Sequence, residues 1–160
     1  MPSGQISRPL RLFLDTGVLI QGHFNPYSSA HAILVLTTLR PRFQALIAEP
    51  VAEEFARWHD AKVAELPEDQ ATRLRAGVSG WLFRARPARV PWPSVPELVT
   101  HADLLAAVRH ANDMPAVVAA VLAQPDWVLS TNTKHWNQEL ADRTGLRVAH
   151  PAAFLAALHP

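Results

Sequence analysis

Three acids and one amide in this sequence have the chemistry needed to hold a divalent metal ion: Asp15, Glu54, Asp113 and Asn132. Asp15 follows a short apolar run, where the strands of open α/β sheets present their ligand-binding residues. Carboxylate and amide oxygens suit Mg²⁺ and Mn²⁺, which keep several waters and bridge to phosphate. A metal bound in this way lowers the pKa of a water molecule for in-line attack on a phosphodiester. We therefore predict a site for metal-assisted hydrolysis.

Glu54 belongs to a helix predicted over residues 50–66, whose apolar stripe includes Val51 and Phe55. At about 100° per residue, Glu54 falls beside this stripe and Glu53 falls on nearly the opposite side. We expect Glu54 to point toward the sheet edge and Glu53 to lie in solvent. A single glutamate beside a buried stripe is more often a plain surface residue, so that alternative stays open.

Asp113 and Asn132 also have structural alternatives. Asp113 precedes a predicted apolar helix and could cap it, a role worth about 1 kcal/mol, although Asn112 could serve as the cap instead. The positive end of the helix dipole keeps a carboxylate at Asp113 ionised, which suits a metal ligand. Asn132 follows a predicted strand, where its carbonyl could accept a metal or a metal-bound water, or could shape a turn.

The elements that must position these residues alternate between strands and helices. Short apolar runs predict strands at 10–15, 43–48, 127–130 and 146–149. Caps, prolines and helical periodicity predict helices at 28–39, 50–66, 67–83, 116–123, 136–140 and 152–158. Residues 84–96 are predicted to be a loop, and 97–111 could hold a short strand at 98–99 and a short helix at 103–111. This alternation favours a parallel sheet covered on both faces.

Composition fits one globular domain. The chain has 160 residues, of which 49% are hydrophobic and 18% charged, enough to bury a core without disulfides. We predict one domain over residues 1–160, with a flexible N-terminus at 1–9. The absence of cysteine excludes thiolate metal sites and a cysteine nucleophile. No segment reaches the ~20 apolar residues of a membrane span, so we expect a soluble, cytoplasmic protein.

Positive charge is concentrated in one part of the chain, although the formal net charge is only +1. Residues 70–96 contain no acid. The arginines of this segment are Arg73, Arg75, Arg84, Arg86 and Arg89. Such a cluster could neutralise the phosphates of RNA, or it could be a solvated helix face followed by a basic loop. Trp81 and Trp92 neighbour it and could stack on bases, and His135 could contact a phosphate.

Three stretches of the sequence resemble the PIN-domain ribonucleases. They are residues 12–19 around Asp15, residues 49–55 around Glu54, and the pair formed by 113–121 and 128–136. In the last pair an acid opens a helix of small residues and a strand ends in a polar turn, with Asn132 nineteen positions after Asp113. The order and spacing of the stretches carry the resemblance, which extends over nearly the whole chain and is weakest from 84 to 111.

The resemblance implies a three-layer α/β/α sandwich with a central parallel sheet in the order 3-2-1-4-5. It also implies that Asp15, Glu54 and Asp113 are the acidic ligands of Mg²⁺ or Mn²⁺, and that these three with Asn132 are the catalytic residues. The family often has a fourth acid at the position of Asn132, so the site has less charge here and a second metal is in doubt. A hydroxyl of Thr131 or Thr16 could assist.

The function implied by the resemblance is that of a metal-dependent endoribonuclease, the toxin of a toxin–antitoxin module. The expected partners are RNA, a small antitoxin and a second copy of the chain. The alternative is a PIN-like RNA-binding or scaffold domain that has lost turnover. Asp15-Thr16-Gly17 also matches the aspartic-protease signature, but that family is all-β. Zinc enzymes are disfavoured because the eight histidines show no close ligand spacing, and nucleotide switches because no Gly-rich loop occurs.

Overall fold

The computed structural model describes residues 8–39 and 42–158 of the chain. Within these ranges five parallel strands form one sheet in the order β3-β2-β1-β4-β5. The strands are β1 (Leu10–Leu14), β2 (Phe43–Ala48), β3 (Ala88–Val90), β4 (Trp127–Leu129) and β5 (Val148–Ala149). The predicted order 3-2-1-4-5 is confirmed. The first seven residues of the predicted flexible N-terminus lie outside the described residues.

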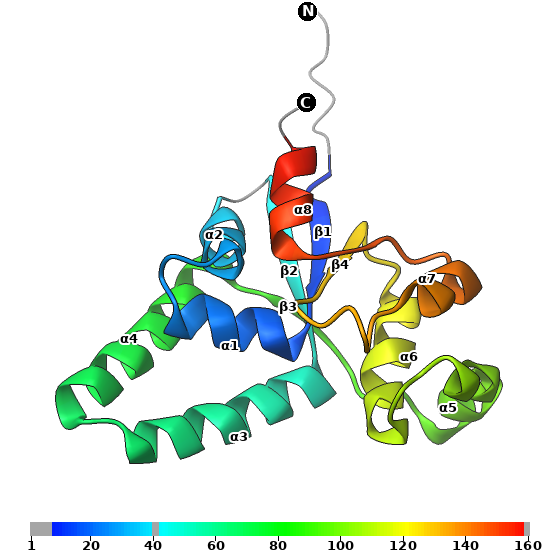
Figure 1. Cartoon of the computed structure of the whole chain (residues 1–160), viewed down its shortest axis with the longest axis horizontal. Coiled ribbons are helices and arrows are strands. Elements are labelled where there is room, and N and C mark those ends of the chain that lie inside the picture. Colours follow the sequence, from blue (N-terminus) through cyan, green and yellow to red (C-terminus); the bar gives the residue numbers. More distant parts are fainter. Residues whose placement is uncertain (1–7, 40–41, 159–160) are drawn as a thin grey trace, which may run out of the picture.

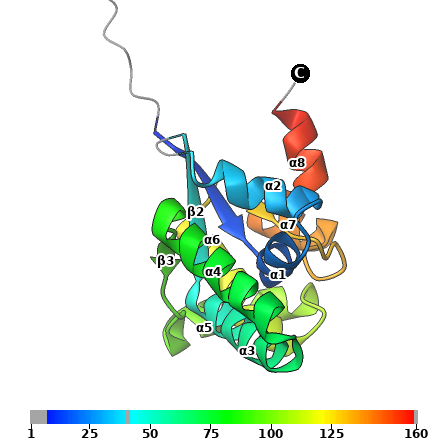
Figure 2. The same ribbon diagram turned by 90° about the vertical axis from the view of Figure 1, so that its left-hand side faces the viewer.

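Helices cover both faces of the sheet. They are α1 (Thr16–Phe24), α2 (Ser29–Leu36), α3 (Glu49–Glu65), α4 (Glu68–Ala85), α5 (Val95–Thr100), α6 (Met114–Ala123), α7 (Gln138–Thr144) and α8 (Pro151–Ala157). Helices α1, α2 and α4 lie on one side of the strands and α5, α6 and α7 on the other, while α8 packs against α2 (Figure 1). Figure 2 looks onto the layer formed by α1, α2 and α4. The fold is therefore the three-layer α/β/α sandwich predicted from the sequence.

The hydrophobic core is centred on the strands in the middle of the sheet, which are formed by apolar stretches of the sequence. Leu12, Phe13 and Leu14 of β1 are completely buried, as are Val128 and Leu129 of β4. Parallel strands covered on both faces require continuous apolar runs instead of alternating ones, which is the pattern these segments show. None of the helices in the described ranges is both long and apolar enough to cross a membrane.

Two segments have a secondary structure that differs from the sequence prediction. A helix cap determines the first and pairing with a neighbouring strand determines the second. Residues 98–99 lie in helix α5, where Ser94 and Glu97 form a reciprocal capping box, and not in a strand. The third strand is Ala88–Val90, within the segment predicted as a loop. It has only three residues at the sheet edge, and its parallel pairing with β2 fixes it.

Two helices also differ in place. Residues 16–24, for which the sequence predicts no element, form α1 directly after Asp15. The helix predicted at 136–140 occupies Gln138–Thr144 instead, because the side chain of Asn137 accepts a hydrogen bond from the backbone of Leu140 and caps it. The predicted helix at 28–39 corresponds to α2, and residues 40–41 lie outside the described part of the chain.

The boundary between β1 and β4 is the topological switch point of the sheet. β1 pairs with β2 on one side and with β4 on the other, and the connections on the two sides lie on opposite faces. In open α/β sheets ligands bind in the crevice outside the carboxyl ends of the strands at such a point. Asp15 follows β1 there, and its backbone N–H donates to the carbonyl of Leu129 at 3.0 Å.

Candidate active site

Asp15 is a partly buried carboxylate at the switch point. Its Oδ2 accepts a hydrogen bond from the hydroxyl of Ser130 at 2.7 Å. Burial raises the pKa of Asp15 above its ordinary value, and the negative charge of Glu54 adds to this rise. Hydrogen bonds from Ser130 and Trp136 oppose the rise in pKa by favouring the charged form. A positive ion at this edge would favour the ionised form further.

Glu54 projects from the first half of α3 toward Asp15. The hydroxyl of Thr16, which is 6% exposed, donates to Glu54 Oε2 at 2.6 Å. Because Thr16 follows Asp15 directly in the chain, this hydrogen bond holds the Glu54 carboxylate near Asp15. The sequence prediction that Glu54 faces the sheet edge agrees with this contact.

Glu53 takes a different direction from Glu54, as the helical periodicity predicts. It is exposed, but it is not simply solvated, because the indole N–H of Trp92 donates to Glu53 Oε1 at 2.8 Å. The backbone N–H of Trp92 donates to Glu49 Oε2 at 3.0 Å. These two acids of α3 hold the loop after β3.

Asp113 stands immediately before α6 in a short 3-10 turn, Ala111–Asp113. It occupies the N-cap position of the helix but makes no side-chain cap hydrogen bond. Its Oδ2 is buried and has no hydrogen-bond partner. The Nδ1 of His135 lies 3.2 Å from this oxygen, a separation that suits an ion pair without the alignment of a hydrogen bond. A buried oxygen in this position is costly unless another group binds it.

Asn132 shapes the loop after β4. Its Oδ1 accepts hydrogen bonds from the backbone N–H groups of Lys134 at 3.1 Å and His135 at 3.4 Å. These bonds form an Asx turn, the structural alternative raised by the sequence. The turn places His135 against Asp113 and beside the ring of His110, whose centroid is 5.4 Å away. A catalytic role of Asn132 stays a prediction.

The donor set suits a hard cation only in part. In the described part of the chain no three acidic or histidine side chains form a group that could hold one ion. Asp15 and Glu54 lie together, and Asp113 is beside His135. Mg²⁺, however, usually takes one or two carboxylates and completes its shell with water. The Asp15–Glu54 pair and the Asp113 oxygen that accepts no hydrogen bond have the oxygen chemistry that such an ion requires.

Ser130 is the residue that sequence reasoning missed. The sequence offered the hydroxyls of Thr131 and Thr16 as helpers, and Thr16 does bind Glu54, but Ser130 is the residue that binds Asp15. Ser130 follows β4 directly, and only the pairing of β4 with β1 brings it to Asp15. The hydroxyl of Thr131 lies against Gly17 instead, so close that a Cβ added at this glycine would collide with it.

The arginine cluster does not form one surface with the acids. Arg73 pairs with Asp69 and Arg75 with Glu68 along α4. Arg84 and Arg86 lie where α4 ends and leads into the amino end of β3, whereas the acids lie at the carboxyl ends of the strands. RNA binding by Arg73, Arg75, Arg84, Arg86 and Arg89 stays a prediction.

Only one of the two tryptophans near this cluster is available to stack on a base. Trp81 is 4% exposed, and its indole N–H donates to Leu34 O and Thr37 Oγ1, so it is a core residue. Trp92 is 45% exposed.

No family model matches the chain, and no curated protein matches it in sequence. Solved structures do match its fold. One is a chain of VapBC2 from Rickettsia felis, in the crystal structure of VapBC2 bound to a DNA fragment from its promoter. The two chains are 14% identical with a TM-score of 0.58, and the match covers 88% of this chain and 98% of that chain. The strand order and this likeness show a PIN-like α/β/α fold.

Proposed function

We propose that this protein is a metal-dependent endoribonuclease that acts as the toxin of a toxin–antitoxin module. The observation that carries the proposal is the Asp15–Glu54 pair at the switch point, with the buried oxygen of Asp113, which accepts no hydrogen bond, as a further acidic donor. The resemblance of the sequence to PIN-domain ribonucleases supports the choice of RNA as substrate, and the fold likeness to a chain of VapBC2 supports a PIN-like fold.

In this proposal Asp15 and Glu54 would bind Mg²⁺ or Mn²⁺ directly, and Asp113 would act as a further oxygen donor toward the water shell of the ion. When bound, such an ion would lower the pKa of a water molecule and would offset negative charge on the phosphate. Ser130 and Thr16 orient the carboxylates of Asp15 and Glu54 through the bonds described above. Residues that hydrogen-bond to metal-binding side chains fix the orientation of those side chains and tune their basicity. His135 contacts a phosphate oxygen when the substrate is bound.

A small antitoxin and a second copy of the chain are the proposed protein partners. The support for an antitoxin is the likeness to a chain of VapBC2. Homodimer formation rests on the resemblance to the PIN family alone.

The neighbouring glutamates of α3 provide the sharpest test. Cleavage of single-stranded RNA is measured with Mn²⁺, with Mg²⁺ and with EDTA, for the wild type, Glu54→Gln and Glu53→Gln. We expect EDTA to abolish cleavage and Glu54→Gln to slow it about 100-fold or more, because loss of a residue behind a ligand already costs about 10- to 100-fold. Glu53→Gln should keep the wild-type rate. Equal effects of the two substitutions would contradict the proposal.

The second candidate is a PIN-like domain that binds RNA without turnover. It is favoured by Asn132, an amide at the position where the family often has an acid and whose oxygen is already used in the turn. RNA binding with no metal-dependent cleavage by the wild type would support this candidate over the nuclease.

A further inference from the structure

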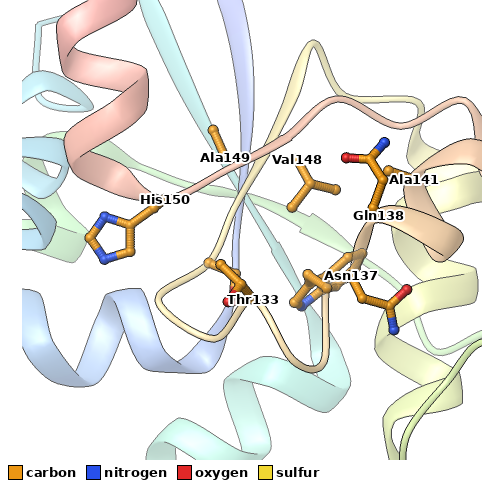
Figure 3. Close-up of a pocket in the computed structure, with 9 residues that line it drawn as sticks. Thr133, Asn137, Gln138, Ala141, Val148, Ala149 and His150 are labelled. Atoms are coloured by element: carbon orange, nitrogen blue, oxygen red, sulfur yellow. The ribbon is translucent and has the colours of Figure 1, made fainter.

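A pocket of about 280 Å³ opens at the carboxyl ends of β4 and β5, beside the carboxylates. Figure 3 shows the β4–α7 loop, which carries Thr133 and Asn137, on one side of the pocket. Val148 and Ala149 of β5 lie on another side, and His150 and Gln138 lie at opposite ends. The volume is just below the roughly 300–1,000 Å³ of sites for drug-sized ligands, so it suits one small, flat group.

The lining of this pocket mixes polar and apolar residues and has no charged group of fixed sign. It consists of Ser130, Thr133, Trp136, Asn137, Gln138, Ala141, Val148, Ala149 and His150, with no acid, lysine or arginine. The lining therefore contrasts with the acidic site next to it. A nucleobase has the matching chemistry, because its faces are apolar and its edge carries neutral donors and acceptors.

Some polar atoms of the pocket are fixed by the fold. Both side-chain atoms of Asn137 are in use, since Nδ2 donates to Ala107 O and Oδ1 accepts from Leu140 N. Asn137 therefore forms a rigid part of the wall. Trp136 is 5% exposed, and its ring meets the edge of Phe13 with centroids 6.0 Å apart.

Other polar atoms can still bind a ligand. Gln138 donates through Nε2 to Asp142 Oδ1 at 2.7 Å, which leaves its Oε1 as an acceptor. His150 accepts from the backbone of Ala152 through Nδ1, so the neutral ring carries its proton on Nε2 as a donor. The hydroxyl of Thr133, which is exposed, can either donate or accept a hydrogen bond. One acceptor, one donor and one hydroxyl are the kind of groups that read the edge of a base.

The pocket and the carboxylate site share Ser130. Its hydroxyl binds Asp15, and the residue also lines the pocket. The loop then runs from Thr133 in the pocket through Lys134 to His135, which lies against Asp113. Lys134 is exposed, and the described residues include no ion-pair partner for its amine. If a base occupied the pocket, the phosphates of its nucleotide would therefore lie near Lys134 and the acidic site.

We propose that this pocket between the β4–α7 loop and β5 binds one base of the RNA strand next to the phosphate that is cleaved. The choice of a nucleobase rests on the proposed ribonuclease function. Thr133, Gln138 and His150 then set the base preference at that position, while Lys134 holds the backbone.

Binding is tested in EDTA, where no cleavage occurs, with AMP, GMP, CMP and UMP as probes. Each nucleotide is titrated into the ¹⁵N-labelled protein and followed by NMR. We expect one or two of the four to shift the amide signals of Thr133, Gln138, Val148 and His150. The double variant Thr133→Val, Gln138→Leu should weaken that binding about tenfold, as expected when hydrogen bonds to the ligand are removed. Gln70→Leu, a glutamine of the same exposed class on α4, is the matched control and should bind as the wild type.

The outcomes separate this inference from the proposed function. Nucleotide binding in the pocket by a protein that cleaves no RNA would support the pocket and contradict the nuclease. Metal-dependent cleavage with no nucleotide shifting these signals, or with equal binding by the double variant, would overturn the pocket and leave the nuclease. A circular dichroism spectrum identical to that of the wild type confirms that the double variant is folded.

Discussion

Two aspartates at opposite edges of the same sheet have opposite environments. Asp126 precedes β4 at the amino edge, and its two oxygens accept from the Arg8 guanidinium at 2.7 and 2.8 Å. The backbone of Arg11 donates to the same carboxylate at 2.7 Å. The bond to Arg8 is the main cause that lowers the pKa of Asp126. Asp126 therefore stabilises the fold as a carboxylate.

Asp15 follows β1 at the carboxyl edge and has no cation beside it among the described residues. Burial raises its pKa, whereas that of Asp126 is lowered. The same side chain is thus stabilising at one edge and costly at the other. A carboxylate that is buried without a cation lowers stability, but it is suited to bind a metal ion or a substrate, because the ligand then supplies the positive charge.

The largest expected effect is that of Asp15→Asn. Cleavage should fall about 100-fold or more, since a proposed metal ligand is removed. In metal-free buffer the melting temperature should rise, because the buried negative charge and its repulsion from Glu54 are eliminated. Thermal unfolding in EDTA and an RNA cleavage assay measure the two effects. A lower melting temperature would mean that the Asp15 carboxylate stabilises the fold, as Asp126 does.

His23 is a second buried titratable group without a compensating partner, and it lies outside the proposed metal site. Its Nε2 is buried without a hydrogen bond, and its ring packs against Trp81 and Phe55. Burial, followed by the charges of His31 and His59, lowers the pKa of His23 from 6.5 to about 4. The unfolded chain therefore takes up the proton first as the pH falls.

The stability due to neutral His23 is present above pH 6.5 and is lost as the pH falls toward 4. At 1.36 kcal/mol per pKa unit the loss is on the order of 3 kcal/mol. Urea unfolding at several pH values measures it. His23→Leu should flatten the dependence between pH 6.5 and 4. If the variant keeps the wild-type slope, another group causes the loss.

Asp126→Asn should have a smaller effect and the opposite pattern to Asp15→Asn. The free energy of unfolding should fall by about 1 kcal/mol, because charge-assisted bonds are removed but Arg8 is largely exposed to solvent. RNA cleavage should be unchanged. Urea unfolding at pH 7 and the cleavage assay together check this pattern. A drop in cleavage without a loss of stability would mean that the two edges do not differ in role.

The smallest expected effect concerns the arginine cluster. If it contacts RNA, Arg84→Ala with Arg86→Ala should weaken binding and lower the salt slope by about 1 for each phosphate that is no longer neutralised. The cleavage rate at saturating RNA should stay the same, because these residues lie at the amino end of β3. Binding measured across a salt series tests the cluster. If the RNA affinity and its salt dependence are unchanged, the arginine cluster is a solvated surface that does not contact RNA.

The central strands and the main acids of the site can be read from the sequence alone. The buried ends of β1 and β2 and the whole of β4 are continuous apolar runs because parallel strands are covered on both faces, and such runs can be read locally. Asp15 could be found because it ends one of these runs. Glu54 could be separated from Glu53 because helical periodicity is also a local property.

Which of these residues come into contact depends on how the strands pair in the folded protein. β3 has three residues and no apolar pattern of its own, so its pairing with β2 makes it a strand. Ser130 reaches Asp15 and Arg8 reaches Asp126 across separations of 115 and 118 residues. No local pattern encodes such contacts, because they depend on the order in which strands pair. The pairing of β1 with β4 is what brings Ser130 to the acid at the switch point and leaves a pocket beside it.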